Sequence, residues 1–311
     1  MKRHAPAVIS LAVVAGVLVL LPFVLSTYNV YLVALVGVFF CAILGLNILT
    51  GYTGQISIGH GAFMAIGGYA TAILSRDHHM NLVLTMVVAF AMCFIAGLLF
   101  GLPALRLSGV YLALATFALA VSIPKLPYKW STYLGGSVGV HTDDIKSNLW
   151  IYVAAWSASG VLLLLAWLIL RGRLGRAFRA VRDSEIAATA SGVETSLYKT
   201  LAFGISAAYC GVAGSLWVIA LSGYAQPTNF SVGLSLTLLV GAAVAGLGSL
   251  WGILAGAAFV GLLPKLSQSV PILGSDHGRD VVYGALVILV MFVAPGGLAG
   301  LLARLRSLVR T

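Results

Sequence analysis

Long apolar stretches alternate with short polar or glycine-rich connections along most of the chain. A membrane-spanning helix needs about 20 predominantly apolar residues to cross a hydrocarbon core of about 30 Å. Three of the stretches are too short to cross at ordinary tilt, so we expect broken or re-entrant helices there. The candidate stretches are residues 7–25, 30–49, 62–74 (short), 82–102, 107–123, 149–170, 200–221, 234–245 (short), 250–263 (short) and 281–293. The pattern predicts an all-α polytopic membrane protein with eight to ten transmembrane helices.

The first apolar stretch, 7–25, follows Lys2 and Arg3 and has two interpretations. A cleaved signal peptide has a short apolar core followed by a small-x-small cleavage site. No such site follows this stretch, and the next apolar segment begins almost at once. The sequence therefore favours a retained first helix.

The composition supports a membrane protein and excludes two other classes. Hydrophobic residues make up 60% of the chain and charged residues 8%, against about 25% charged residues in a soluble domain. Because a soluble protein of this length keeps a large surface in water, a soluble globular enzyme is excluded, as is a disordered chain. The three cysteines lie in apolar stretches without a C-x-x-C pair. We therefore expect neither a disulfide framework nor a metal site.

The distribution of basic residues predicts the orientation. The chain has 18 Lys and Arg against 8 Asp and Glu, a formal net charge of +10. Cytoplasmic loops of membrane proteins carry an excess of Lys and Arg. The basic regions are the N-terminus (Lys2, Arg3), the segment 171–199 (Arg171, Arg173, Arg176, Arg179, Arg182, Lys199) and the C-terminal tail (Arg304, Arg306, Arg310). We place all three in the cytoplasm, within a single transmembrane domain, 1–311, whose longest outer loop is 124–148.

Several classes of protein are disfavoured by residues that the chain lacks. No Asp, Glu, Lys or Arg lies near the middle of any predicted span, whereas ion-coupled carriers usually need an ionisable residue there. The sequence has no phosphate-binding G-x-x-x-x-G-K-[ST] loop, so any ATP must be hydrolysed by another subunit. It also lacks an H-E-x-x-H motif, and its Ser, His and acidic residues show no convincing clustering, which disfavours an intramembrane enzyme. A self-sufficient carrier or channel for a small neutral solute remains the alternative to an ATP-driven system.

The cytoplasmic segment 171–199 contains a predicted surface helix of about two turns. Asp183 or Ser184 can cap its N-terminus, and Glu185 in the first turn suits the helix dipole. Small residues continue the helix, and Gly192 is placed to end it in a left-handed conformation.

This predicted helix has two interpretations. Its small, alanine-rich face would let a second protein approach closely, with flanking arginines that pair with acids on that protein or with lipid phosphates. The alternative is a solvated, positive-inside loop without a partner. After the helix, Thr195 or Ser196 is expected to cap the membrane helix that follows.

A glycine-rich segment, 45–69, interrupts the apolar pattern. Its glycines allow close packing or a break in a helix. Neutral polar side chains at Asn47, Gln55, Ser57 and His60 can line a path for a polar solute, or can form hydrogen bonds between helices without a role in transport.

A short echo of this segment appears later in the chain. Residues 54–58, Gly-Gln-Ile-Ser-Ile, resemble residues 246–250, Gly-Leu-Gly-Ser-Leu. Paired interrupted helices in two halves of a chain are typical of an internal inverted repeat around a central path. We therefore expect such a repeat.

The chain resembles the permease subunits of bacterial branched-chain amino acid ABC importers. Four blocks spread over most of the chain carry the resemblance, together with a Pro-x-Gly-Leu near the C-terminus. The blocks are G-L-N-x-x-x-G-x-x-G-Q-x-S-x-G-H-x-x-F (Gly45, Asn47, Gln55, Ser57, Gly59, His60, Phe63), R-x-x-G-x-Y-x-A-x-x-T (Arg106, Gly109, Tyr111, Ala113, Thr116), G-R-x-x-x-A-x-R-x-x-E-x-A-A-x-x-x-G (Gly175 to Gly192) and G-x-G-S-x-x-G (Gly246 to Gly252), followed by Pro295, Gly297 and Leu298.

The resemblance implies partners and roles. The resemblance implies an assembly at the bacterial inner membrane. Its parts would be two related permeases, two ATP-binding subunits that hold Mg–ATP, and an extracytoplasmic solute-binding protein. It implies that this chain binds no cofactor and catalyses no reaction. The coupling segment that docks on the ATP-binding subunits would comprise Arg182, Asp183, Ser184, Glu185, Ala187, Ala188 and Gly192. The translocation path would include Asn47, Gln55, Ser57, Gly59 and His60.

Three positions depart from the pattern of the family. Val138 stands in an outer stretch where members often carry Asp-Gly or Asn-Gly, Thr237 replaces a frequent Glu, and Ala245 replaces a glycine before the fourth block. Branched-chain amino acids are the solutes that the resemblance implies, but related systems carry amides, urea or aromatic acids. These departures leave the choice among those solutes open.

Overall fold

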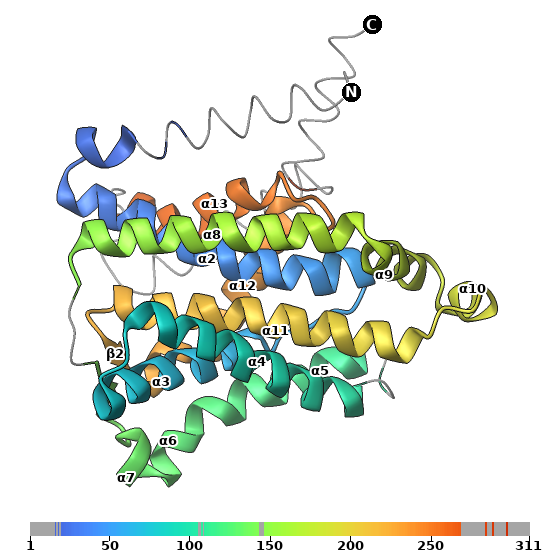
Figure 1. Ribbon diagram of the computed structural model, residues 1–311, viewed down its shortest axis with the longest axis horizontal. Coiled ribbons are helices and arrows are strands. Elements are labelled where there is room, and N and C mark those ends of the chain that lie inside the picture. The colour runs from blue at the N-terminus through green and yellow to red at the C-terminus, as the bar shows by residue number, and fades with distance from the viewer. Residues whose placement is uncertain are drawn as a thin grey trace, which may run out of the picture.

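The computed structural model describes residues 16, 18, 20–104, 107, 109–142, 146–268, 284, 288 and 297. Within these residues the chain forms a bundle of helices that run roughly along one axis (Figure 1). The long helices are α2 (Thr27–Thr53), α3 (His60–His78), α4 (Leu82–Ala104), α5 (Val110–Ser122), α8 (Asn148–Arg171), α11 (Thr195–Ala220), α12 (Val232–Ala245) and α13 (Ile253–Gln268).

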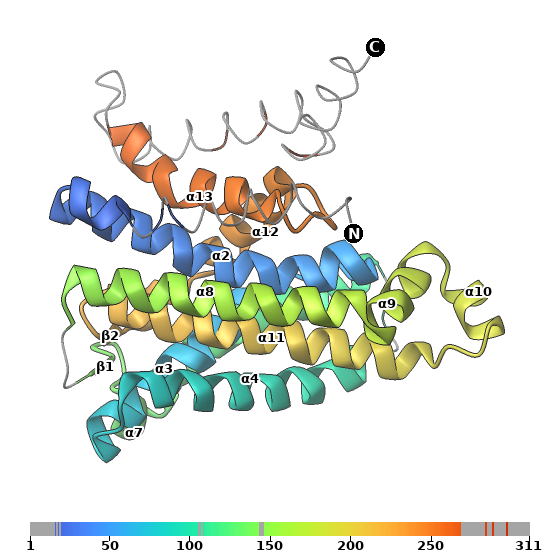
Figure 2. The ribbon, with the colours of Figure 1, turned by 45° about the horizontal axis from the view of Figure 1, so that its top comes forward.

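Two helices, α2 and α11, form the centre of the bundle. In each, 89% of the most apolar window is buried, against 33% in α4 and 28% in α8. Figure 2 shows the pair lying between α13 on one side and α4 on the other. A helix that is apolar on all sides is expected in such a central position, because every face meets another helix. The outer helices expose apolar faces suited to lipid or to another membrane protein.

Close approach between α3 and α11 depends on small residues. A Cβ atom added to Gly67 of α3 would overlap the backbone of Gly211 in α11. Small residues at such contacts let membrane helices pack backbone against backbone. Beside them, the Thr71 hydroxyl of α3 donates to the Ser215 hydroxyl of α11 at 2.7 Å.

The two ends of the bundle differ in structure. At one end, α9 (Arg173–Asp183) and α10 (Glu185–Ala190) extend past the long helices (Figure 1). We call it the α10 end. The opposite end carries η1 (Ile123–Lys125), α6 (Leu126–Lys129), α7 (Ser131–Leu134), η2 (Pro227–Phe230) and an antiparallel pair of strands, β1 (Val140–His141) and β2 (Tyr224–Ala225). This second group includes most of the predicted outer loop, 124–148.

The apolar stretches predict most of the described helices. The stretches 30–49, 82–102 and 149–170 lie within α2, α4 and α8, and 200–221 matches α11 to within one residue at its end. Six helical segments in the described part of the chain are long and apolar enough to span a membrane. The all-α, multi-pass membrane architecture is thereby confirmed. The predicted stretch 281–293, apart from residues 284 and 288, and more than half of 7–25 lie outside the described residues.

The three short stretches have different outcomes. The stretch 62–74 belongs to α3, which has 19 residues because its helix continues through the polar residues up to His78. The stretch 234–245 belongs to α12, and with the preceding η2 the apolar segment Pro227–Ala245 reaches 19 residues. The stretch 250–263 gives α13, which begins later than predicted because residues 246–252 form a turn.

Candidate functional site

The interruption predicted in 45–69 is present between α2 and α3. Gly54 ends α2 in a left-handed conformation, with φ +73°, and its backbone N–H donates to Leu49 O. This conformation is open to glycine at little cost and strained for most other residues. Residues 55–59 then run without helical structure until α3 begins at His60.

A second glycine turn joins α12 to α13. Gly246 and Gly248 both have positive φ, at 90° and 80°. The Ser249 side chain stabilises the exit of the turn, because its Oγ accepts a hydrogen bond from Gly252 N at 3.2 Å. We call the segment Gly54–Gly59 and the turn Gly246–Gly252 together the glycine junction.

The two parts of the glycine junction are held together through α2. The buried Asn47 side chain accepts from Gly248 N at 2.8 Å and donates to Ser249 O at 3.1 Å. Gly51, one turn further along α2, faces the same turn, and a Cβ atom there would overlap Gly248 N and the Asn47 side-chain oxygen. The two segments that echo each other in sequence therefore lie close together, at the α10 end of the bundle.

A chain of hydrogen bonds fixes His60. Ser206 of α11 donates its hydroxyl to Gly45 O at 2.6 Å, so its oxygen is left to accept from His60 Nε2 at 2.6 Å. The proton therefore belongs on Nε2, and the bare Nδ1 accepts from the Ser57 hydroxyl at 3.1 Å. The Ser57 oxygen in turn accepts from Gly59 N at 3.3 Å. This network joins α2, α3 and α11 through a neutral imidazole.

The five residues predicted for a translocation path are all buried. Gln55 Nε2 donates to Thr53 Oγ1 at 3.0 Å and to Lys199 O at 3.5 Å. Gly59 lies against Thr116 of α5, whose hydroxyl accepts from Ile58 N at 3.0 Å. In this conformation the polar groups connect helices, as in the alternative interpretation of the sequence. A role for these residues in transport stays a prediction, and it requires the polar groups to separate from their present partners.

The predicted surface helix of the 171–199 segment is α10. Ser184 caps it, with its side chain accepting from Ala187 N at 3.2 Å, and Glu185 lies in the first turn. Gly192 has φ +80°, as predicted. Of the predicted coupling residues, all except Ala188 are exposed; Ala188 is buried within the chain. The side chain with the greatest apolar exposure on α10 is Ile186, which is 85% exposed and was not singled out from the sequence.

One capping prediction is wrong. Thr195 and Ser196 do not cap α11; the helix begins at Thr195, and Glu194 occupies the N-cap position without a side-chain hydrogen bond to the helix. Thr195 and Ser196 therefore fall inside the first turn. The sequence offers two hydroxyl residues next to the boundary, and the helix starts one residue before the pattern suggests.

A further helix, α9, was missed between α8 and α10. Its buried face consists of Gly175, Ala177, Phe178 and Val181. The apolar residues at 174, 177, 178 and 181 have the i, i+3, i+4, i+7 spacing that predicts an amphipathic helix. The arginines between these apolar residues make the segment strongly basic, and the apolar spacing was therefore overlooked.

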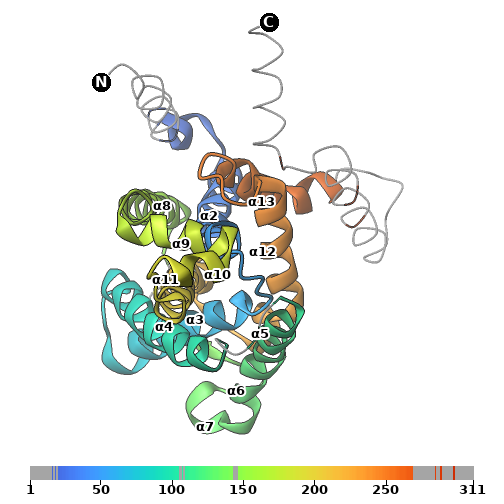
Figure 3. The same cartoon turned by 90° about the vertical axis from the view of Figure 1, so that its right-hand side faces the viewer.

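Two basic residues connect the α10 region to the glycine junction. Lys199, in the first turns of α11, forms an ion pair with Glu185 of α10 at 2.5 Å, and its backbone carbonyl accepts from Gln55. Arg182, at the end of α9, donates to Gly51 O at 3.2 Å and forms an ion pair with Asp183 at 3.0 Å. Seen from this end, α9 and α10 lie in front of α2 and α11 (Figure 3). Lys199 thus links α10 to Gln55 of the junction, and Arg182, which precedes α10, contacts Gly51, which packs against Gly248 of the other part.

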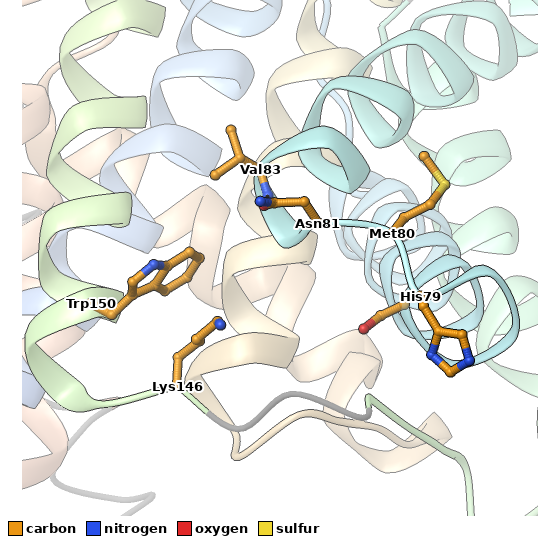
Figure 4. A pocket seen from close by; sticks show the side chains of 7 residues that line it. His79, Met80, Asn81, Val83, Lys146 and Trp150 are labelled. Carbon is orange, nitrogen blue, oxygen red and sulfur yellow. The ribbon is translucent and has the colours of Figure 1, made fainter.

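The opposite end of the bundle carries an open pocket of about 470 Å³ (Figure 4). The α3–α4 connection supplies His79, Met80 and Asn81, and the start of α8 supplies Trp150. Lys146 lies between them, with its amine 5.6 Å from the centre of the Trp150 ring. This pocket combines the Lys146 cation, the Trp150 ring and the Asn81 amide at the end of the bundle away from α10.

Comparisons with known proteins place the chain in a family. The sequence profile described as branched-chain amino acid transport system / permease component matches residues 28–293. The high-affinity branched-chain amino acid transport system permease protein LivM of Salmonella typhimurium is 29% identical over 308 residues, covering 89% of this chain and 71% of that protein. LivM of Escherichia coli is 28% identical with the same coverage.

A second kind of permease is also similar. The permease protein LivH of Escherichia coli is 29% identical over 193 residues, covering 61% of this chain and 59% of that protein. No solved structure gives a significant match. Because the profile covers far more than half of the sequence, the chain belongs to the family of branched-chain amino acid transport permeases.

Proposed function

We propose that this chain is a permease subunit of an ATP-driven importer that moves branched-chain amino acids inward across the bacterial inner membrane. Similarity to both LivM and LivH supports pairing with a second, homologous permease. Two ATP-binding subunits would supply Mg–ATP hydrolysis, and an extracytoplasmic binding protein would deliver the solute. The observation that carries this proposal is the exposed α10, joined by the Glu185–Lys199 ion pair to the core of the bundle.

The charge distribution supports a cytoplasmic α10 end. Within the described residues, this end carries the six basic residues of the segment 171–199, as expected for the cytoplasmic side. With this orientation the pocket in Figure 4 opens on the outer side. Cytoplasmic termini and eight to ten crossings complete this topology. Both glycine turns lie at the α10 end, whereas an inverted repeat would place matching segments at opposite ends of the bundle, so the two turns are not the matching segments of such a repeat.

The glycine junction would form the inner closure of the path. Docked ATP-binding subunits would move α10, and the ion pair to Lys199 would pass this movement to α11 and to Gln55. Arg182 would pass it to Gly51 and thus to the turn held by Asn47. Loss of the few hydrogen bonds across the junction would separate α2 from the α12–α13 turn. The buried polar groups there would then be available to a solute.

Two observations support a branched-chain amino acid as the solute: the family of the chain and the neutral character of the glycine junction. Asn47, Gln55, Ser57 and His60 offer hydrogen bonds without a fixed charge, which suits a zwitterion with an aliphatic side chain. Selection among amino acids would belong mainly to the binding protein. The exposed Val138 at the outer end is one position where this chain would contact that protein differently from its relatives.

Reconstitution tests the proposal. Proteoliposomes that contain both permeases and both ATP-binding subunits should take up radiolabelled leucine only with internal ATP–Mg and external binding protein. Liposomes with this chain alone should show no uptake above protein-free liposomes. Leucine uptake by this chain alone, without ATP, would establish a self-sufficient carrier and contradict the proposal.

A further inference from the structure

The arginines between Arg171 and Arg182 fall into two groups according to what they contact. Arg179 donates to a backbone carbonyl at the end of α8, and Arg182 binds Gly51 O and Asp183. Arg171, Arg173 and Arg176 have exposed side chains and no acidic partner among the described residues. Three positive charges thus lie at the corner between α8 and α9 without an acidic partner in the described part of the chain.

Arg171 is placed by an aromatic ring at the edge of an apolar surface. Its guanidinium lies 3.9 Å from the centre of the Trp167 ring, one turn earlier on α8. Trp167 is itself exposed, and so are the neighbouring Leu164 and Leu168. Trp side chains concentrate where hydrocarbon meets lipid headgroups. The exposed leucines therefore mark the lipid-facing side of α8, and Trp167 marks the depth of the interface.

Arg173 and Arg176 lie just beyond this interface. The chain turns at Gly172, and α9 packs its Ala177–Phe178 side against the bundle. Arg173 and Arg176 are three residues apart, so they share a face of α9 that points away from the buried side. Clusters of arginine at such a position attract acidic lipid headgroups, each contributing about 1 kcal/mol.

We propose that Trp167, Arg171, Arg173 and Arg176 form a binding surface for the headgroup of an acidic phospholipid. The arginines pair with the phosphate and the additional negative charge, while Trp167 and the exposed leucines of α8 contact the glycerol and acyl chains. The surface secures the α8–α9 corner to the bilayer and so fixes the position from which α9 and α10 extend. This inference does not depend on the transport proposal, since it needs only that the corner lies at a membrane surface.

A lipid fits this surface better than a docked protein. Trp167 belongs to a continuous exposed apolar face of α8, which a water-soluble subunit would have to reach through lipid. α10, by contrast, extends past the bundle and is open to such a subunit (Figure 1). The arginines and α10 thus present two surfaces, one toward the bilayer and one toward solution.

The test compares lipid retention by the full chain and by two matched triple variants. Spin-labelled phosphatidylglycerol and spin-labelled phosphatidylcholine are exchanged into membranes of purified protein, and the immobilised fraction of each gives their relative association. Arg171→Gln/Arg173→Gln/Arg176→Gln removes the surface. Lys125→Gln/Lys129→Gln/Lys146→Gln removes three charges at the opposite end and is the control.

The unmodified chain should prefer phosphatidylglycerol, and the preference should decrease with added salt. In the arginine triple variant, the preference for phosphatidylglycerol should fall at least about fivefold, which is the effect expected from the loss of one surface charge. The lysine variant should keep most of the preference. Equal preference in the arginine variant and the unmodified chain would overturn the proposal. So would a variant that keeps its lipid preference but no longer binds the ATP-binding subunits, because the surface would then be a protein contact.

Discussion

Replacing Ile186 with aspartate is expected to weaken binding of the ATP-binding subunits to the permease by about 10- to 100-fold. Burial of one isoleucine side chain contributes about 1.5–3 kcal/mol, and Ile186 is 85% exposed on a helix that extends past the bundle. Apolar anchors of this kind dominate the energetics of many interfaces. The substitution should leave the permease folded, because the side chain makes little contact with its own chain. Co-purification of the ATP-binding subunits at several protein concentrations measures the loss.

Val138→Asp is the matched control for this experiment. Val138 is an exposed aliphatic residue at the end opposite α10, 71% exposed, so the chemical change is comparable and the location differs. Assembly with the ATP-binding subunits should be unchanged in this variant. Normal assembly of Ile186→Asp, or equal loss in both variants, would show that α10 is not the docking point.

Charge reversal of either member of the Glu185–Lys199 pair is expected to reduce transport about tenfold. The Lys199 side chain is only 12% exposed and lies 2.5 Å from the Glu185 carboxylate. Glu185→Lys places two positive charges together, and Lys199→Glu places two negative charges together, so in each variant α10 separates from α11. ATP-driven leucine uptake, normalised to the amount of assembled complex, measures the effect.

The double variant, Glu185→Lys with Lys199→Glu, separates an internal link from a contact with the partner. If the pair acts within this chain, the reversed pair should restore uptake to within about threefold of the unmodified protein. Failure of the double variant to recover would mean that Glu185 acts on an ATP-binding subunit instead. Asp77→Asn, which alters an exposed ion pair at the opposite end, should leave uptake unchanged.

The sequence predicts the elements better than it predicts their contacts. Helices such as α2, α4 and α8 follow from the length of their apolar stretches, since a bilayer sets a minimum span. The short α10 follows from local chemistry, because Ser184 and Gly192 specify the two ends through their own backbone and side-chain preferences. These features depend on residues close together in the chain, where composition and spacing are sufficient.

Contacts between distant segments could not be predicted in the same way. Asn47 binds a turn about 200 residues away, and nothing in either segment specifies that they meet. The same limit applies to Lys199, which appears in the sequence only as one of several basic residues until its ion pair with Glu185 is seen. The path residues illustrate the consequence: their polarity is evident from the sequence, but the helices that they connect depend on the packing of α2, α3 and α11.

The accessibility of α10 from each side of the membrane tests the central claim most directly. The three native cysteines are buried, so a single Ala190→Cys change places one reactive thiol on α10. A membrane-impermeant maleimide should label it in inverted vesicles but not in spheroplasts, and the assembled ATP-binding subunits should protect it. Val138→Cys should show the opposite sidedness. Labelling of Ala190→Cys in spheroplasts, or labelling unaffected by the ATP-binding subunits, would contradict a permease driven from the cytoplasm through α10.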